Sequence, residues 1–351
     1  MAVINKDYAN IKVGTTDLQR LYAGNTLIWE LESPTPTDYS TQYLTFIAKG
    51  GGNNRFYFKG STWLRSGVTY KNLISYSTDS GATWSEPSNE VSLNVSSGDV
   101  VMWKGNMTSE NLTLTGIGKF ANTDTNFDVY GNIMSLLYGD NFIGQTDLSN
   151  MPYAFMYLFQ TTDVVDASNL VLPATTLSLS CYGSMFISCP YLIKAPQLPA
   201  TTMAYQCYQN MFRDCTALAQ APALPATTLE TRCYQNMFQG CFALTTAPSL
   251  PATALTDSCY YYMFRSCSGL TTAPDLLATT LTPYCYSYMF ANCTNLNYVK
   301  MLATDISANS CLTNWLQNVA SSGTFVKDAN TTIQTGDSGI PRYWTIETAQ
   351  E

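Results

Sequence analysis

The second half of the chain repeats one pattern of apolar and polar positions with a fixed period. The line Cys-Tyr-x-x-Met-Phe-x-x-Cys occurs five times, each time followed by Leu, and its first cysteines lie 26 positions apart (207 − 181 = 26). A unit of this size cannot bury its own apolar face, so its neighbours must cover it. The period predicts a solenoid of five repeats, at residues 173–198, 199–224, 225–250, 251–276 and 277–302.

Within one repeat, apolar residues return at every fourth position. Leu229, Cys233, Met237 and Cys241 follow this spacing, which is typical of one face of a helix. The residues after Cys241 read as a short extended run that ends at two prolines, which can neither continue a helix nor lie in a central ladder. Each repeat is therefore predicted to combine a helix with a short strand. Stacked repeats of this kind would carry helices on one face and a narrow parallel sheet on the other.

Divergent sequence is predicted to close both ends of the solenoid. Residues 116–172 should join the two halves of the chain and cap the first repeat, through a degenerate coil that lacks the cysteines. Residues 303–351 contain a degenerate repeat, in which Trp315 and Leu316 replace Met and Phe, and then a C-terminal cap. Terminal repeats need such atypical sequence because one of their faces meets water.

The N-terminal half follows the two-residue period of β-strands. Residues 1–31 predict a small β docking unit with a hairpin turn at Gly24-Asn25, and residues 32–41 read as a linker. Residues 42–115 hold short runs of β-branched and aromatic residues separated by Gly, Asn and Ser, which predict a β-sandwich. The expected fold class is multidomain, with an N-terminal all-β half (a short β unit plus a β-sandwich) followed by an α/β solenoid of 26-residue repeats.

The composition narrows the class of partner. Charged residues make up only 12% of the chain and its net charge is −8. Nucleic acids and anionic membranes bind clustered Lys and Arg, so neither is an expected partner. The N-terminal sequence lacks the apolar core of a signal peptide, and no run of about 18 apolar residues could span a membrane. With Met1 at its start, we expect a protein made in a cytoplasm and then assembled into a larger structure.

Eleven cysteines lie between Cys181 and Cys311. Their odd number prevents complete pairing within one chain, and Cys-x7-Cys spacing in a chain without histidine does not suit zinc. We interpret them as small buried thiols with a structural role, and disulfides between neighbouring coils remain the alternative. No metal and no cofactor is expected. The cysteines of the five repeats are Cys181, Cys189, Cys207, Cys215, Cys233, Cys241, Cys259, Cys267, Cys285 and Cys293.

Two sets of tyrosines differ in how they repeat. One set follows the first cysteine of each repeat and predicts an aromatic ladder between coils: Tyr182, Tyr208, Tyr234, Tyr260 and Tyr286. The other set varies from repeat to repeat, together with several amides. Variable residues on a constant scaffold are where a solenoid would carry recognition, and a merely soluble polar face is the alternative. These candidate recognition residues are Tyr205, Gln209, Asn210, Gln235, Asn236, Tyr261, Tyr262, Tyr284, Tyr288 and Tyr298.

One local motif raises the question of catalysis. Residues 77–84, Ser-Thr-Asp-Ser-Gly-Ala-Thr-Trp, fit the Asp-box pattern of sialidase-type propellers. Its physical content is a hairpin turn, in which Asp79 bonds turn amides, Gly81 adopts a backbone conformation that other residues avoid, and Trp84 packs beneath. A single copy does not make a propeller, and a Ser-His-Asp triad cannot form without histidine. We therefore predict a structural role for these residues, no catalytic residues and no enzymatic activity.

The repeats resemble BspA-like leucine-rich repeats, whose units read as aromatic-x-x-Cys-x-x-Leu before a short strand. The matching residues are Phe186 with Cys189 and Leu192, Phe212 with Cys215 and Leu218, Phe238 with Cys241 and Leu244, Phe264 with Cys267 and Leu270, and Phe290 with Cys293 and Leu296. The resemblance covers roughly half of the chain. It implies a leucine-rich-repeat solenoid, and it implies little about the ligand.

Segments that flank the repeats resemble proteins encoded by phages of gut Bacteroidota, including virion proteins of crAss-like phages. These segments are YAGNTLIWE, SYSTDSGATW, VVMWKGN, GNIMSLLYGDNF and GIPRYWTIE. The resemblance implies a non-enzymatic virion protein such as a fibre, appendage or decoration subunit, docked to other virion proteins through its N-terminal β region. We expect a homo-oligomer that displays the solenoid to a glycan or protein of the host surface. The alternatives are a bacterial cell-surface adhesin and, on the Asp-box alone, a glycoside-processing enzyme.

Overall fold

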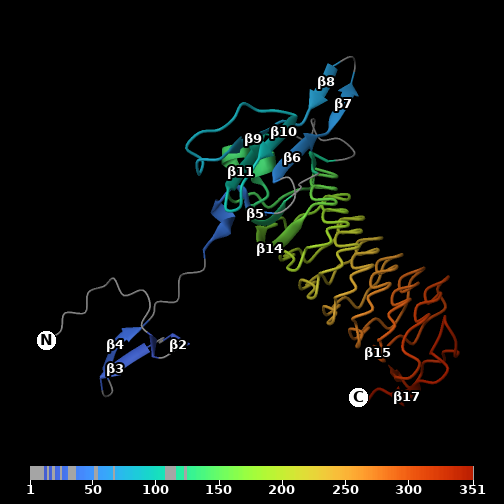
Figure 1. The fold of residues 1–351 in the computed structure, drawn as a ribbon. Helices are drawn as coiled ribbons and strands as arrows, with labels where there is room; N and C mark the ends of the chain where they lie inside the picture. Colours follow the sequence, from blue (N-terminus) through green and yellow to red (C-terminus); the bar gives the residue numbers. More distant parts are fainter. Residues whose placement is uncertain are drawn as a thin grey trace. The chain divides into compact units, whose positions relative to one another are not determined.

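The secondary structure is mostly β, arranged in several sheets, with very little helix (Figure 1). The computed structural model describes residues 12–13, 16–17, 20–23, 26–30, 37–50, 54–65, 68–106, 116–121 and 125–350. Within these ranges there is one short α-helix, α1 (Ser135–Tyr138), and two 3-10 helices, η1 (Tyr39–Thr41) and η2 (Gly139–Asn141). The chain divides into two compact units, Met1–Asp38 and Tyr39–Glu351.

The first unit contains two antiparallel strand pairs. Strand β1 (Lys12–Val13) pairs with β2 (Thr16–Asp17), and β3 (Arg20–Ala23) pairs with β4 (Thr26–Glu30). The β3–β4 pair lies where the sequence predicts a hairpin. The predicted turn at Gly24-Asn25 lies outside the described residues, as do residues 32–36 of the predicted linker.

Two sheets open the second unit. The larger sheet has the order β14 (Val164–Val171), β13 (Asn126–Asn132), β5 (Leu44–Gly50), β11 (Val100–Gly105) and β9 (Ile74–Ser77). The smaller sheet has the order β10 (Glu90–Asn94), β6 (Arg55–Gly60) and β12 (Gly118–Phe120), and a separate hairpin joins β7 (Thr62–Arg65) to β8 (Val68–Lys71). Residues along β6 and β11 alternate between buried and less buried positions, because successive side chains of a strand point to opposite faces.

Aromatic rings fill the space between these sheets. Phe46 of the larger sheet lies 5.3 Å from Phe56 and 4.6 Å from Phe120 of the smaller one, measured between ring centroids. Trp103 lies 5.0 Å from Phe120. All four side chains are fully buried, as expected for the inner faces of two packed sheets.

The segment 116–172, predicted to join the two halves, supplies strands to both sheets. It contributes β12 to the smaller sheet and β13 and β14 to the larger one. Residues 107–115, at the end of the predicted β-sandwich, lie outside the described residues. Strand β13 pairs antiparallel with β5 and parallel with β14, so the change to parallel pairing occurs inside this segment.

After β14 the chain winds into coils that stack on one another, drawn from green to red in Figure 1. Backbone N–H groups alternate between two kinds of acceptor. Tyr182 donates to the carbonyl oxygen of Cys207 in the next coil (3.1 Å), whereas Gly183 donates to Ser180 in its own coil (3.0 Å). The same alternation recurs in later coils, so every second residue ties a coil to its neighbour and the residues between close tight turns.

Every fourth residue on this side of a coil has a positive φ. Ser180, Ser184 and Ser188 have φ of 48°, 54° and 58°, and Arg232 and Asn236 occupy equivalent places with 57° and 56°. We call this side of the stacked coils, with its alternating hydrogen bonds and its left-handed residues, the turn ribbon. Left-handed residues do not extend into helices, because Cβ would approach the following carbonyl oxygen.

The helix predicted in each repeat is therefore wrong, and so is the α/β class of the repeat region. No helix occurs among residues 146–350. The apolar spacing of four is the period of the turn ribbon and only approximates the 3.6 residues of a helix turn. Half of the N–H groups find their acceptors one coil away, where a helix would use the carbonyl four residues back.

The opposite side of each coil is extended and pairs in parallel. Single bridges connect Asp166, Lys194, Gln220 and Thr246 in succession, and Thr272 connects to Tyr298. Toward the C-terminus, three parallel strands continue this row of single bridges: β15 (Tyr298–Met301), β16 (Thr324–Lys327) and β17 (Thr345–Thr348). A narrow parallel sheet on this side agrees with the sequence prediction.

Both ends of the stack are covered. At the start, Phe120 of β12 donates its N–H to the carbonyl of Leu158 (2.8 Å), and Ile117 donates to Ala154 (3.2 Å). At the end, the indole N–H of Trp315 donates to Gly339 (2.9 Å). The first coil thus rests on the small sheet, and the last on residues near the C-terminus.

Candidate functional site

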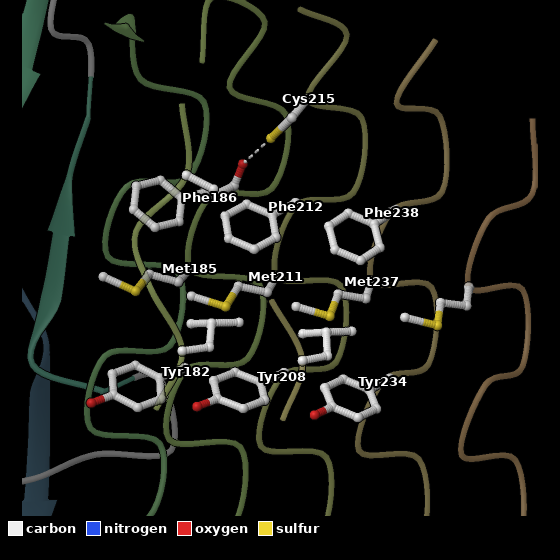
Figure 2. Packing of buried hydrophobic residues seen from close by; sticks show 14 of the residues in the cluster. Tyr182, Met185, Phe186, Tyr208, Met211, Phe212, Cys215, Tyr234, Met237 and Phe238 are labelled. Atoms are coloured by element: carbon white, nitrogen blue, oxygen red, sulfur yellow. Dashed lines mark hydrogen bonds between the residues drawn. The ribbon is translucent and has the colours of Figure 1, made fainter. Parts of the chain in front are cut away.

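The residues that repeat without change form the core of the stack. The tyrosines predicted as a ladder lie in one column, with neighbouring ring centroids 5.7 to 6.1 Å apart and planes within 17°. A parallel column of phenylalanines has spacings of 5.6 to 5.8 Å. Figure 2 shows both columns with methionines between them. These rings are buried, so they stabilise the stack and cannot contact a ligand.

The cysteines of the repeats are all free and buried. The second cysteine of each repeat donates its thiol to a carbonyl in the preceding coil, as Cys215 does to Phe186 (3.0 Å, dashed in Figure 2) and Cys293 to Phe264 (3.0 Å). Burial raises the pKa of Cys293 to about 12. A protonated thiol is a poor nucleophile, so these cysteines connect coils and are not placed for chemistry.

Nine of the ten candidate recognition residues lie on the turn ribbon, and Tyr298 is the exception. Tyr298 begins β15 on the extended side of the stack. The other nine occupy left-handed positions or the residues next to them, and all are partly or largely exposed. We call the exposed side of the turn ribbon the turn face. Its members among the predicted set are Tyr205, Gln209, Asn210, Gln235, Asn236, Tyr261, Tyr262, Tyr284 and Tyr288.

Four tyrosines gather on the turn face in neighbouring coils. The ring centroid of Tyr262 lies 4.7 Å from that of Tyr288, with nearly parallel planes. Tyr261 meets Tyr262 at 4.2 Å edge to face, and it meets Tyr284 at 6.3 Å. Burial, and then the hydrogen bond with Tyr262, raises the pKa of Tyr261. We call these four residues the tyrosine cluster.

Polar side chains that the sequence reasoning did not select complete this cluster. The guanidinium of Arg265 lies 5.1 Å from the ring centroid of Tyr262, in a cation–π arrangement. The amide of Asn314 donates to the hydroxyl of Tyr288 (3.0 Å), and that of Asn309 donates to Tyr284 (3.3 Å). Their position in the 26-residue frame, at or next to a left-handed residue, is the signal that could have identified them.

Amides form a ladder on the same face, closer to the N-terminus. The side chain of Asn236 donates to the Oδ1 of Asn210 (2.9 Å), and Asn210 donates to the hydroxyl of Ser184 (3.4 Å). Asparagine is among the residues that tolerate positive φ best. Tyrosine does so less readily, yet Tyr262, Tyr284 and Tyr288 have φ of 59°, 57° and 54°.

The Asp-box residues form a compact turn after β9. The carboxylate of Asp79 accepts from the Thr83 N–H (2.9 Å) and the Thr83 hydroxyl (2.6 Å), and the Ser77 hydroxyl donates to it (2.7 Å). These bonds hold the pKa of Asp79 at about 2. Gly81 has φ of 87°, and Trp84 lies 4.9 Å from Tyr43. The three residues occupy the structural places that the motif predicts.

Three comparisons with known proteins found nothing similar: no family model, no curated protein and no solved structure matches the chain. In the part of the chain that the structure describes, no group of three or more Cys, Asp or Glu side chains is arranged to hold a metal ion. The helices of that part are all too short to cross a lipid bilayer.

Proposed function

We propose that the protein is a non-enzymatic structural subunit of a virion, such as a fibre, appendage or decoration protein. In this proposal its coils form a leucine-rich-repeat solenoid that binds a glycan or protein of the host surface. The observation that carries the proposal is the turn face, where aromatic and amide side chains change from coil to coil over a constant core. Such a face recognises its partner through ring stacking and hydrogen bonds, with little use of charge.

The geometry of the stack supports the solenoid part of this proposal. Hydrogen bonds between residues one coil apart and rings stacked at a constant spacing are the nearest-neighbour contacts that define solenoids. The rigid frame holds the tyrosine cluster without further ordering. A preorganised surface loses less entropy on binding than a flexible one, so the cluster suits recognition.

The virion part rests on the resemblance of the flanking segments to phage proteins. In this proposal the N-terminal β unit, residues 1–31, docks to other virion proteins, and copies of the chain assemble into an oligomer. Mass spectrometry of particles purified on a density gradient tests this part, with a host cytosolic protein as the contamination control. The chain should co-purify with the capsid protein at a constant ratio across the particle peak, and its absence from the peak would refute a virion location.

The binding part is tested with the full chain and intact host cells. The double change Tyr262→Ala and Tyr288→Ala removes the stacked pair, and we expect cell binding to weaken roughly tenfold or more, equivalent to about 1.4 kcal/mol. Phe242→Ala is the matched control, because Phe242 is also an exposed ring (52%) of the stack but lies outside the tyrosine cluster. Equal binding by the double variant and the wild type would rule out the tyrosine cluster as the recognition site.

A further inference from the structure

A surface hollow of about 870 Å³ lies between the last coil and the C-terminal residues. Leu316, Asn318 and Ser321 line one part of it, and residues 334–339 and 341–343 line the rest. Its volume is within the range of ligand sites in proteins. The hollow includes Asn318, the last left-handed residue of the turn ribbon, and it does not include the tyrosine cluster.

The backbone around this hollow is fixed by contacts that serve the cap. Leu316 donates its N–H to the carbonyl of Asp337 (3.4 Å), and Asn314 donates to the hydroxyl of Ser338 (2.9 Å). Within residues 334–343, Gly336 and Ile340 are joined by an N–H to carbonyl bond of 2.8 Å. Gly336 has φ of 132°, which L side chains rarely adopt. This segment is therefore a preorganised loop.

The side chains of Arg342 and Tyr343, which line the hollow, take no part in closing the core. Pro341 accepts a hydrogen bond from the N–H of Trp344 (3.1 Å), which closes a four-residue turn with Arg342 and Tyr343 at its tip. Trp344 is buried and its indole donates to Ala320 (2.8 Å). The ring of Tyr343, by contrast, is 82% exposed, the highest value among the exposed large apolar side chains of the described residues.

The chemistry of the lining selects one class of ligand. Arg342 and Asp337 contribute one charge of each sign, and the other polar groups are hydroxyls and amides such as those of Thr335 and Gln334. Nucleotides and other polyanions need several cations, and a protein partner needs about 800 Å² of its own surface. A sugar ring has an apolar face for an exposed aromatic ring, and its hydroxyls both donate and accept hydrogen bonds.

We propose that this hollow is an oligosaccharide-binding site, in which the ring of Tyr343 packs on a sugar ring, Asp337 accepts from sugar hydroxyls and Arg342 donates to sugar oxygens. This site is separate from the tyrosine cluster and does not depend on the proposed role of the turn face.

The test uses the full chain on an array of bacterial capsular oligosaccharides and mucin-type O-glycans, followed by calorimetry with the glycans that bind. Tyr343→Ala should weaken glycan binding roughly tenfold. The double variant with Tyr343→Ala and Asp337→Asn should bind more weakly still. Tyr191→Ala is the matched control, since Tyr191 is also an exposed tyrosine (52%) but lies in an early coil. Thermal unfolding checks the fold, and it should be unchanged because Tyr343 contributes little to packing.

Each outcome decides between the two sites. The hollow is supported if Tyr343→Ala weakens glycan binding while the Tyr262→Ala, Tyr288→Ala variant binds like the wild type. This result would stand even if the proposed function were refuted. Binding that only the tyrosine-cluster variant loses overturns the hollow and leaves the turn face standing. The inference is also overturned if no glycan binds, or if the chain captures only peptides.

Discussion

Phe46 lies between the two sheets of residues 44–171, which we call the sandwich, and Phe238 lies in the stack. Both are fully buried, yet their surroundings are built differently. Phe46 meets four aromatic rings from different strands and Phe159 of the first coil, at planes of 34° to 81°. Phe238 meets Phe212 and Phe264 in the neighbouring coils, both at 8° and at 5.8 and 5.6 Å. In the sandwich each contact is particular to one residue, whereas in the stack one contact is repeated along the column.

Removing these two rings is the strongest test of the comparison. Phe46→Ala and Phe238→Ala should each lower the free energy of unfolding by about 3–5 kcal/mol. The first should loosen both sheets and the first coil, because Phe46 also contacts Phe159 of that coil. The second should loosen only neighbouring coils, since a stack unfolds through nearest-neighbour contacts.

Hydrogen exchange followed by mass spectrometry measures how far each effect spreads. Leu244→Met, a volume-conserving change in the same coil core, is a control that should have a small effect. If exchange after Phe238→Ala also rises throughout the sandwich, the two regions unfold as one cooperative unit and the comparison fails.

The cysteine columns provide a finer comparison within the stack. Cys241 donates its thiol to the carbonyl of Phe212 in the preceding coil (3.1 Å), whereas Cys233 is equally buried and its hydrogen-bond partners are backbone groups of its own coil. Cys241→Ala should therefore cost about 1 kcal/mol more than Cys233→Ala, the net value of one hydrogen bond. Urea unfolding of both variants measures the difference. Equal losses would mean that the thiols act only by filling space.

A glycine substitution distinguishes the turn ribbon from the helix that the spacing suggests. Ser258 has φ of 57°, so Ser258→Gly should be more stable than Ser258→Ala by about 1 kcal/mol. In a helix interior the alanine variant would be the more stable one, because glycine lowers stability there by about 1 kcal/mol relative to alanine. Thermal unfolding of the two variants, compared directly, gives the sign. A more stable alanine variant is incompatible with the turn ribbon at this position.

The smallest effect concerns pH and the Asp-box turn. Hydrogen bonds from Thr83 lower the pKa of Asp79 from 3.8 to about 2, so its contribution to stability is complete above pH 4 and is lost as the pH falls through 2. Asp79→Asn should remove this dependence. Tryptophan fluorescence, titrated between pH 5 and about 2, measures this dependence in both proteins. The same acid response in Asp79→Asn would assign the dependence to another group.

The alkaline response should distinguish the stack from this turn. Burial raises the pKa of Cys181 and Cys189 from 9.0 to about 12. A raised pKa in the folded state means that stability is complete below pH 9 and decreases as the pH rises toward 12. The Asp79 carboxylate stays ionised over this range, so its hydrogen bonds should persist while the coils loosen at high pH.

Much of the stack could be predicted because its constraints repeat. The spacing of Cys181, Tyr182, Met185 and Phe186 identifies core positions, and all four are fully buried. Some of the left-handed positions could also have been recognised, since Asn, Asp, Ser and Gly occupy most of them, although Tyr, Thr, Gln and Arg occupy the others. In the sandwich, the pairing of β6 with both β10 and β12 joins residues far apart in the chain, and no local pattern specifies such a pairing.

The candidate site divides in the same way. Nine predicted residues share the turn face because they share a place in the repeat. Tyr298 was selected for its variability alone, which does not reveal the side of the coil on which a residue lies. The hollow near Tyr343 could not be predicted, because it forms between the last coil and a cap that follows no period.

The sequence by itself determined which side chains enter the core of the coils, because burial of apolar groups at a constant spacing is a local property that repeats. Only the tertiary structure decided the backbone that carries them. Half of the N–H groups on the turn side are satisfied by carbonyls one coil away, so the turn ribbon has its hydrogen bonds only when the coils are stacked. An isolated segment has no such neighbour, so its apolar residues at every fourth position resemble one face of a helix.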